Sequence, residues 1–214
     1  MMKPQVIFLD AVGTLFGVKN NVGWAYTEIS RKHGGDYDSE LVNQSFYQCF
    51  KDSSPLSFDT QEEALVKSLE FDWWKQIAKN TFESLDLLDN FSNFDDFFVE
   101  LYKHFATEKP WYIYDDVIAN LNLWKKEGVE LAIISNFDTR IFSVLDSLDL
   151  SQYFSSITIS SLSGVAKPHP DIFIKALNNY NCPPENAWYI GDSKKEDYWG
   201  AKAVGMKSFW LSRE

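Results

Sequence analysis

Polar side chains that could do chemistry follow four apolar segments of this 214-residue chain, each where the apolar run ends. Residues 6–9 and 130–134 end directly on such side chains, residues 188–190 end on Gly191 and Asp192, and a fourth group lies in the loop after residues 157–160. In an open parallel sheet the loops beyond the carboxyl ends of the strands form one crevice. We therefore expect these side chains to meet at one site. They are Asp10, Ser135, Asn136, Lys167, Asp192 and Asp197.

These residue types together suit the transfer of a phosphoryl group. An aspartate such as Asp10 attacks phosphorus only where a cation offsets the negative charge of both partners. Lys167 is such a cation, and Ser135 with the Asn136 backbone amide can donate hydrogen bonds to phosphoryl oxygens. A second carboxylate, Asp192, suits Mg²⁺, which proteins hold by one or two carboxylates plus substrate phosphate. Each residue taken alone also has a structural explanation as a helix cap or a solvated loop side chain.

The elements that must position these residues alternate between strand and helix in the second half of the chain. The apolar runs predict parallel strands over 6–9, 130–134, 157–160, 188–190 and 207–211, with helices between them. Residues 18–108 are predicted to be almost entirely helical. Within them, Thr60 and Glu63 have capping-box spacing and predict the start of a long helix. We expect its buried stripe to be Leu65, Leu69, Trp73 and Ile77.

Composition excludes several classes of function. Thirty-one acidic and 20 basic residues give a net charge of −11, which argues against nucleic acid or an anionic membrane surface as a partner. Cys49 and Cys182 have no metal-ligand spacing and cannot form a disulfide framework, so a reducing cytoplasm is the expected location. No signal-peptide pattern and no apolar run of membrane-spanning length occurs.

The order of these motifs resembles that of the haloacid dehalogenase-like hydrolase superfamily. The pattern is Asp-x-x-Gly-Thr at Asp10 to Thr14, then Ser135, then Lys167, then Gly-Asp-x-x-x-x-Asp from Gly191 to Asp197. The resemblance implies an α/β fold: a Rossmann-like parallel sheet core from residues 1–17 and 109–214, with an α-helical cap inserted at 18–108. It also implies a covalent intermediate on Asp10 and a Mg²⁺ site formed by Asp10, the Val12 carbonyl, Asp192 and Asp197. We expect Asp197 to orient metal-bound water better than to bind the ion directly.

Val12 is the one departure from the pattern of the phosphatase members, which carry a second aspartate there. Valine can transfer no proton, and such help is worth about 10²–10⁴-fold. We expect a Mg²⁺-dependent phosphatase that acts on a small phosphorylated metabolite with a good leaving group. The alternatives are a metal-independent 2-haloacid dehalogenase, which lacks that aspartate too, and a catalytically weak ligand-binding relative. The substrate, the oligomeric state and the group that replaces the missing acid are not predicted.

Overall fold

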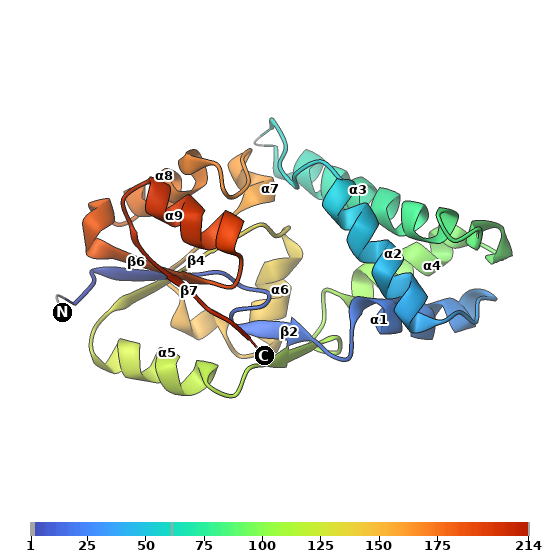
Figure 1. Ribbon diagram of the computed structural model, residues 1–214, viewed down its shortest axis with the longest axis horizontal. Coiled ribbons are helices and arrows are strands. Elements are labelled where there is room, and N and C mark those ends of the chain that lie inside the picture. The colour runs from blue at the N-terminus through green and yellow to red at the C-terminus, as the bar shows by residue number, and fades with distance from the viewer. Residues whose placement is uncertain (1–2, 61, 214) are drawn as a thin grey trace.

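A five-stranded parallel sheet forms the centre of the larger of two lobes in the computed structural model, which describes residues 3–60 and 62–213 (Figure 1). The strand order is β5-β4-β1-β6-β7, with Val6 of β1 opposite Glu130 of β4 and Ala187 of β6. All five predicted strands are present, and the predicted α/β fold is confirmed. The bounds are β1 Val6–Leu9, β4 Glu130–Ser135, β5 Ser156–Ile159, β6 Ala187–Gly191 and β7 Lys207–Trp210.

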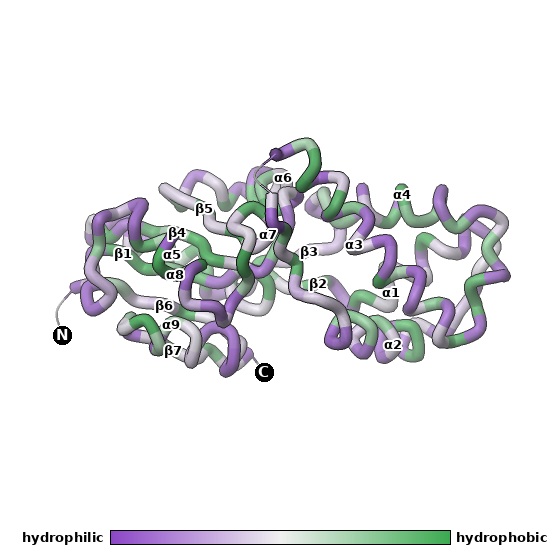
Figure 2. The backbone as a smooth tube through the Cα atoms, turned by 90° about the horizontal axis from the view of Figure 1, so that it is seen from above, coloured by the Kyte–Doolittle hydropathy of each residue, from purple (hydrophilic) through white to green (hydrophobic). Residues whose placement is uncertain are grey.

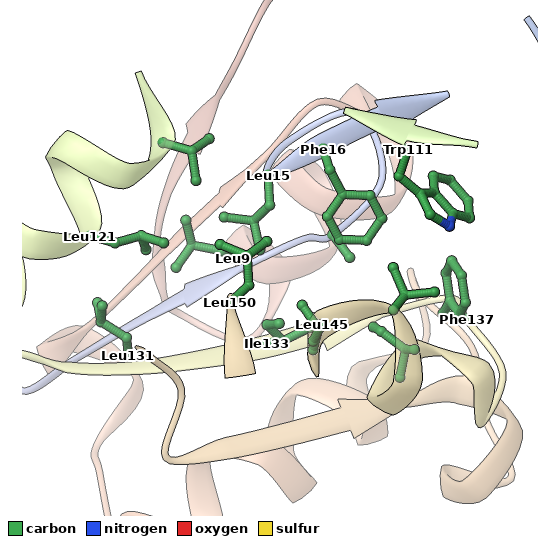
Figure 3. Close-up of a cluster of buried hydrophobic side chains, with 14 of the residues drawn as sticks. Leu9, Leu15, Phe16, Trp111, Leu121, Leu131, Ile133, Phe137, Leu145 and Leu150 are labelled. Carbon is green, nitrogen blue, oxygen red and sulfur yellow. The ribbon is translucent and has the colours of Figure 1, made fainter. Parts of the chain in front are cut away.

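Helices cover both faces of this sheet, which makes β1 a strand buried on both sides (Figure 1). One face carries α5 (Val117–Lys126) and α6 (Arg140–Ser147), and Figure 3 shows their side chains meeting those of β1 and β4. The other face carries α8 (Pro170–Asn178) and α9 (Gly200–Ala203). Continuous apolar runs of this kind are typical of parallel strands with both faces covered. Short connecting elements are η3 (Ser151–Tyr153), α7 (Ser160–Ser163), η4 (Pro184–Asn186) and a π-helical turn, η5 (Lys194–Trp199).

Four helices form the second lobe, which we call the helical lobe. They are α1 (Val22–Ser30), α2 (Ser39–Asp52), α3 (Glu63–Glu83) and α4 (Phe94–His104), with short turns η1 (Arg31–His33) and η2 (Leu88–Asn90). The lobe has an aromatic core of its own, in which Phe82 and Phe97 are fully buried with ring centroids 5.4 Å apart. Over the described residues, every helix of the protein is too short or too polar to span a bilayer.

The chain passes between the lobes through a short antiparallel ribbon that the sequence did not predict. It pairs β2 (Phe16–Val18) with β3 (Trp111–Ile113), and Figure 2 shows it between the two lobes. Each strand has only three residues, which is too few to show the alternation of apolar and polar residues that predicts a strand. The predicted boundary near residues 17 and 109 falls beside this ribbon. The division into a core domain and an inserted helical cap stays a prediction.

Two predictions about the start and the buried face of α3 are wrong. The helix begins at Glu63, and the Thr60 hydroxyl accepts a hydrogen bond from the backbone N–H of Glu62, so no Thr60–Glu63 capping box forms. Of the expected stripe only Ile77 is buried, whereas Val66 and Glu70 are fully buried. The buried face is rotated because α3 packs on the sheet lobe as well as on the other helices, and a polar contact at Glu70 fixes that second interface.

Candidate active site

The turn after β1 presents Asp10 at the end of the central strand. The backbone N–H of Asp10 donates to the Ile190 carbonyl of β6 (3.0 Å), and the N–H of Gly13 closes the turn on the Phe16 carbonyl (2.8 Å). Gly13 has a φ of +88°, and a Cβ there would lie 2.3 Å from a carboxylate oxygen of Asp192. Only glycine satisfies both conditions. The Gly-Thr turn therefore allows Asp192 to pack closely beside Asp10.

A buried lysine joins two of the carboxylates. Lys167 is 4% exposed, and its Nζ donates to Oδ1 of Asp10 (2.7 Å) and to Oδ1 of Asp197 (2.6 Å). The third N–H is directed to the Tyr189 hydroxyl (3.0 Å). All three donors of the ammonium group are therefore engaged, as a buried charge requires.

The side chain of Asn136 forms hydrogen bonds with the backbone of Lys167. Its Oδ1 accepts from the N–H of Lys167 (2.7 Å), and its Nδ2 donates to the Lys167 carbonyl (3.0 Å) and to Glu196 (3.3 Å). Asn136 was predicted to bind substrate. Its side-chain amide is engaged with the loop that carries Lys167, and substrate binding by the backbone amide of Asn136 stays a prediction.

Three carboxylates, those of Asp10, Asp192 and Asp197, gather within 4.8 Å of one another. Asp197 already uses both oxygens, because Oδ1 accepts from Lys167 and Tyr189 and Oδ2 accepts from the backbone N–H of Ser193 (2.9 Å). Lys167 engages only Oδ1 of Asp10, and Asp192 is exposed to the cavity. Asp10 and Asp192 thus fit the role of direct Mg²⁺ ligands better than Asp197, because hard oxygen donors with free lone pairs suit this ion.

Burial and crowding of like charges shift the pKa values at this site. Burial raises the pKa of Asp10 to about 7, because the opposing effect of Lys167 is partly cancelled by Asp197 and Asp192. Partial removal from water and the charge of Asp197 raise the pKa of Asp192. Burial alone would lower the pKa of Lys167, but Asp10 and Asp197 outweigh it and hold the pKa above its ordinary value. Three carboxylates against one ammonium leave excess negative charge, which a divalent cation would neutralise.

One cavity of about 530 Å³ is lined by every residue that the sequence analysis selected. Ser135, 3% exposed, ends β4 at its wall, and Val12 lies between Asp10 and the helical lobe. Tyr47 and Phe50 of α2 also line this cavity, so both lobes contribute to it. The predicted site residues that meet here are Asp10, Val12, Ser135, Asn136, Lys167, Asp192 and Asp197.

Sequence reasoning missed Tyr189 and Glu196. Tyr189 is fully buried in β6, where an aromatic side chain reads as core, yet its hydroxyl contacts Lys167 and lies 2.9 Å from Asp197. Glu196 lines the cavity beside Asn136, and burial raises its pKa. The only signal for Glu196 was its place next to Asp197, within the final motif. No sequence signal distinguished Tyr189 from its apolar neighbours.

The helical lobe also forms hydrogen bonds with the loop that follows β4. The fully buried Glu70 accepts hydrogen bonds from the backbone N–H (2.9 Å) and the hydroxyl (2.5 Å) of Thr139. One helical turn later, Trp74 Nε1 donates to Oδ2 of Asp138 (2.6 Å). Asp138 in turn binds the Arg140 guanidinium through both of its oxygens. These contacts tie α3 to the segment that carries Ser135 and Asn136.

Comparisons with known proteins agree with this architecture. A Bos taurus protein, haloacid dehalogenase-like hydrolase domain-containing protein 3, is 33% identical over 212 residues, which cover 99% of this chain and 83% of that protein. Glyceraldehyde 3-phosphate phosphatase of Pyrococcus furiosus is 42% identical over 88 residues, covering 41% of this chain and 37% of that enzyme. The structure of L-2-haloacid dehalogenase from Xanthobacter autotrophicus is similar with a TM-score of 0.72 and 18% identity, over 100% of this chain and 79% of that one.

The last of these similarities concerns the fold alone, and it shows that the fold is compatible with more than one hydrolytic chemistry. Residues 4–205 match the family described as haloacid dehalogenase-like hydrolase. That match spans both lobes and all four motifs of the site. The chain therefore belongs to the haloacid dehalogenase-like hydrolases.

Proposed function

We propose that this hydrolase is a Mg²⁺-dependent phosphatase in which Asp10 attacks the phosphorus atom of a small phosphorylated metabolite. One observation carries the proposal: a buried lysine links Asp10 to Asp197 beside a third carboxylate, Asp192. Lys167 offsets the repulsion between an attacking carboxylate and a phosphoryl group. The remaining negative charge favours a divalent cation. The similarity of 41% of this chain to glyceraldehyde 3-phosphate phosphatase of Pyrococcus furiosus supports the same chemistry.

The proposed reaction has two steps. Lys167 offsets the charge of Asp10, and one carboxylate oxygen of Asp10 forms the new bond to phosphorus while the bond to the leaving oxygen breaks. Water then attacks the aspartyl phosphate, releasing inorganic phosphate and restoring Asp10. The Ser135 hydroxyl donates a hydrogen bond to a phosphoryl oxygen during both steps. When bound by Asp10, Asp192 and the main chain of Val12, Mg²⁺ would stabilise the charge on the phosphoryl oxygens.

Val12 limits the substrates that this site can use. Its side chain lines the cavity where a phosphatase would present an acid to the leaving oxygen, and it has no proton to give. A leaving group that is stable as an anion needs less protonation. The site therefore favours aryl and acyl phosphates over alkyl phosphates.

The second candidate is a 2-haloacid dehalogenase, which Val12 favours because a halide leaves without a proton. Such an enzyme needs a cation for the substrate carboxylate. Arg140 borders the helical-lobe side of the site, but its Nε and Nη2 donate to Asp138 and its Nη1 to the Tyr102 carbonyl. Arg31 pairs with Glu28 and Asp36, and Arg213 pairs with Asp116. Each of the three arginines of the chain is thus already neutralised by a carboxylate, which disfavours this candidate.

The test measures phosphate release from 4-nitrophenyl phosphate and halide release from 2-chloropropionate, each with Mg²⁺ and with a chelator. We expect phosphate release that requires Mg²⁺ and falls on the order of a thousandfold in Asp10→Asn. Asp146→Asn, an exposed carboxylate of α6, is the matched control and should change nothing. Phosphate release at the same rate with the chelator as with Mg²⁺ would reject the proposal that the reaction requires a metal ion. Halide release with chelator present would establish the dehalogenase, and inactivity towards both would favour a ligand-binding relative.

A further inference from the structure

A second cavity, of about 210 Å³, lies between the two lobes and is lined mostly by aromatic side chains. Tyr26 of α1 and Phe98 of α4 form part of its helical-lobe wall. Trp111 of β3 and Phe137 form part of the opposite wall, at the end of the buried cluster in Figure 3, with ring centroids 6.1 Å apart. An apolar cavity of about 150 Å³ is sufficient to bind benzene. This cavity therefore has room for one six-membered ring with small substituents.

The aromatic cavity adjoins the carboxylate-lined cavity, and the two share part of their lining. The residues that line both are Val12, Val18, Tyr47, Phe50, Asn136 and Phe137. Val12, two residues after Asp10, lines both cavities, so its side chain borders the space between the phosphoryl site and the aromatic lining. A phosphoryl group at Asp10 thus has an apolar compartment beside it for the rest of the molecule.

The charges around the aromatic cavity are already balanced. Arg140 is the one charged side chain in its lining over the described residues, and it is paired with the fully buried Asp138. The guanidinium also stacks 3.9 Å from the centre of the Tyr102 ring. The Asn136 amide is engaged with Lys167. A charged group would lose its hydration here and find no unpaired opposite charge in the lining, whereas an aromatic ring needs no such partner.

From this geometry we propose that the substrate is an aryl phosphate, with its ring in the aromatic cavity and its phosphoryl group at Asp10. The inference rests on the proposed phosphatase function and narrows its substrate class. Two independent features agree on it: the apolar lining selects a ring, and the absence of an acid at Val12 selects a leaving group such as a phenolate. The P–O bond to the phenolic oxygen breaks, and the phenolate takes its proton from solvent water after release.

The test compares two phosphonates that cannot be hydrolysed, phenylphosphonate and methylphosphonate. Binding to the full chain is measured by calorimetry in Mg²⁺ buffer. We expect phenylphosphonate to bind at least tenfold more tightly, which is about 1.4 kcal/mol and below the full value of burying a phenyl ring. The fluorescence of the tryptophans in the lining, Trp74 and Trp111, should change with phenylphosphonate and not with methylphosphonate.

Variants in the wall of the aromatic cavity test whether the phenyl ring binds there. Val22→Phe places a larger side chain in the cavity wall and should reduce the phenyl-to-methyl affinity ratio to about one, and Leu101→Phe does the same from α4 if Val22→Phe fails to fold. Val99→Phe, on an exposed position of α4, is the matched control and should keep the ratio. Equal affinity of the wild type for both phosphonates would overturn the inference and leave the phosphatase proposal standing. If neither phosphonate binds, the phosphatase proposal fails first, and the inference fails with it.

Discussion

Replacing Asp10 with asparagine should stabilise the metal-free protein, increasingly so as the pH rises. The pKa of Asp10 is 3.8 in an ordinary setting and about 7 in the folded protein, because burial and the neighbouring carboxylates oppose its charge. Between these two values the folded state holds a proton that the unfolded chain has lost. The free energy of unfolding therefore falls as the pH rises between these values, by about 1.4 kcal/mol per pH unit, and the contribution of Asp10 is lost fully once the pH passes about 7. The asparagine side chain does not titrate, so it removes this pH dependence of the unfolding free energy. Its amide oxygen can still accept a hydrogen bond from Lys167.

The assay is urea unfolding of the wild type and Asp10→Asn in chelator from pH 5 to pH 8. The difference in unfolding free energy should change by about 3 kcal/mol over this range, in favour of Asp10→Asn at the higher pH. Asp146→Asn should give a flat difference. Saturating Mg²⁺ should shrink the change for the wild type, because the ion favours the ionised carboxylate, and at 100 times its Kd it adds about 2.7 kcal/mol. A flat difference for Asp10→Asn, or one of opposite sign, would refute the reasoning that burial and the neighbouring acids oppose the charge of Asp10 in the folded state.

Three further outcomes test the site and its supports. Val12→Asp should raise the hydrolysis of alkyl phosphates by about 10²–10⁴-fold relative to aryl phosphates, and equal rates on both in the wild type would contradict the missing-acid explanation. Lys167→Met leaves two buried carboxylates unpaired and should lower the unfolding free energy by about 3–5 kcal/mol at pH 8, and by less at pH 5 where Asp10 is protonated. Glu70→Ala leaves the Thr139 N–H without its acceptor and should cost about 1–3 kcal/mol in urea unfolding, whereas the exposed Glu83→Ala on the same helix should cost little.

The sheet could be predicted because its signals are local. Each buried strand is a continuous apolar run, and the polar residue that ends it marks the edge of the sheet where the site lies. The ribbon of β2 and β3 could not be predicted in this way, because two three-residue strands become stable only when they pair across the 92 residues between them. The prediction of the buried face of α3 was wrong for a related reason. Glu70 is buried by its contact with Thr139, which lies 69 residues away in the sequence.

The candidate site residues were visible in the sequence, and Asp197 was already expected to orient metal-bound water rather than bind the ion directly. The hydrogen bonds that distinguish Asp197 from Asp192 were not visible. Asp192 and Asp197 have the same side chain and stand five residues apart. The structure separates them, because Asp197 is fully hydrogen-bonded to Lys167, Tyr189 and Ser193, while Asp192 faces the cavity. No pattern of residue types reveals which oxygen of a carboxylate is already engaged. Tyr189 was missed because an aromatic residue within a strand is more often part of the core.

The hydrogen bonds of Lys167 indicate how the site can accept a substrate. The ammonium group has three donors, directed to Asp10, Asp197 and Tyr189. A phosphoryl oxygen that approaches Lys167 must therefore replace one of these acceptors. The Tyr189 hydroxyl is neutral and lies farthest from Nζ, at 3.0 Å, and without the lysine its O–H can still donate to the Ile134 carbonyl or to Asp197. Bonds between charged partners are the stronger ones, so the bond to Tyr189 is the one that an incoming phosphate displaces at least cost. Lys167 would then bridge the attacking carboxylate and the phosphoryl group while Asp197 keeps it in place.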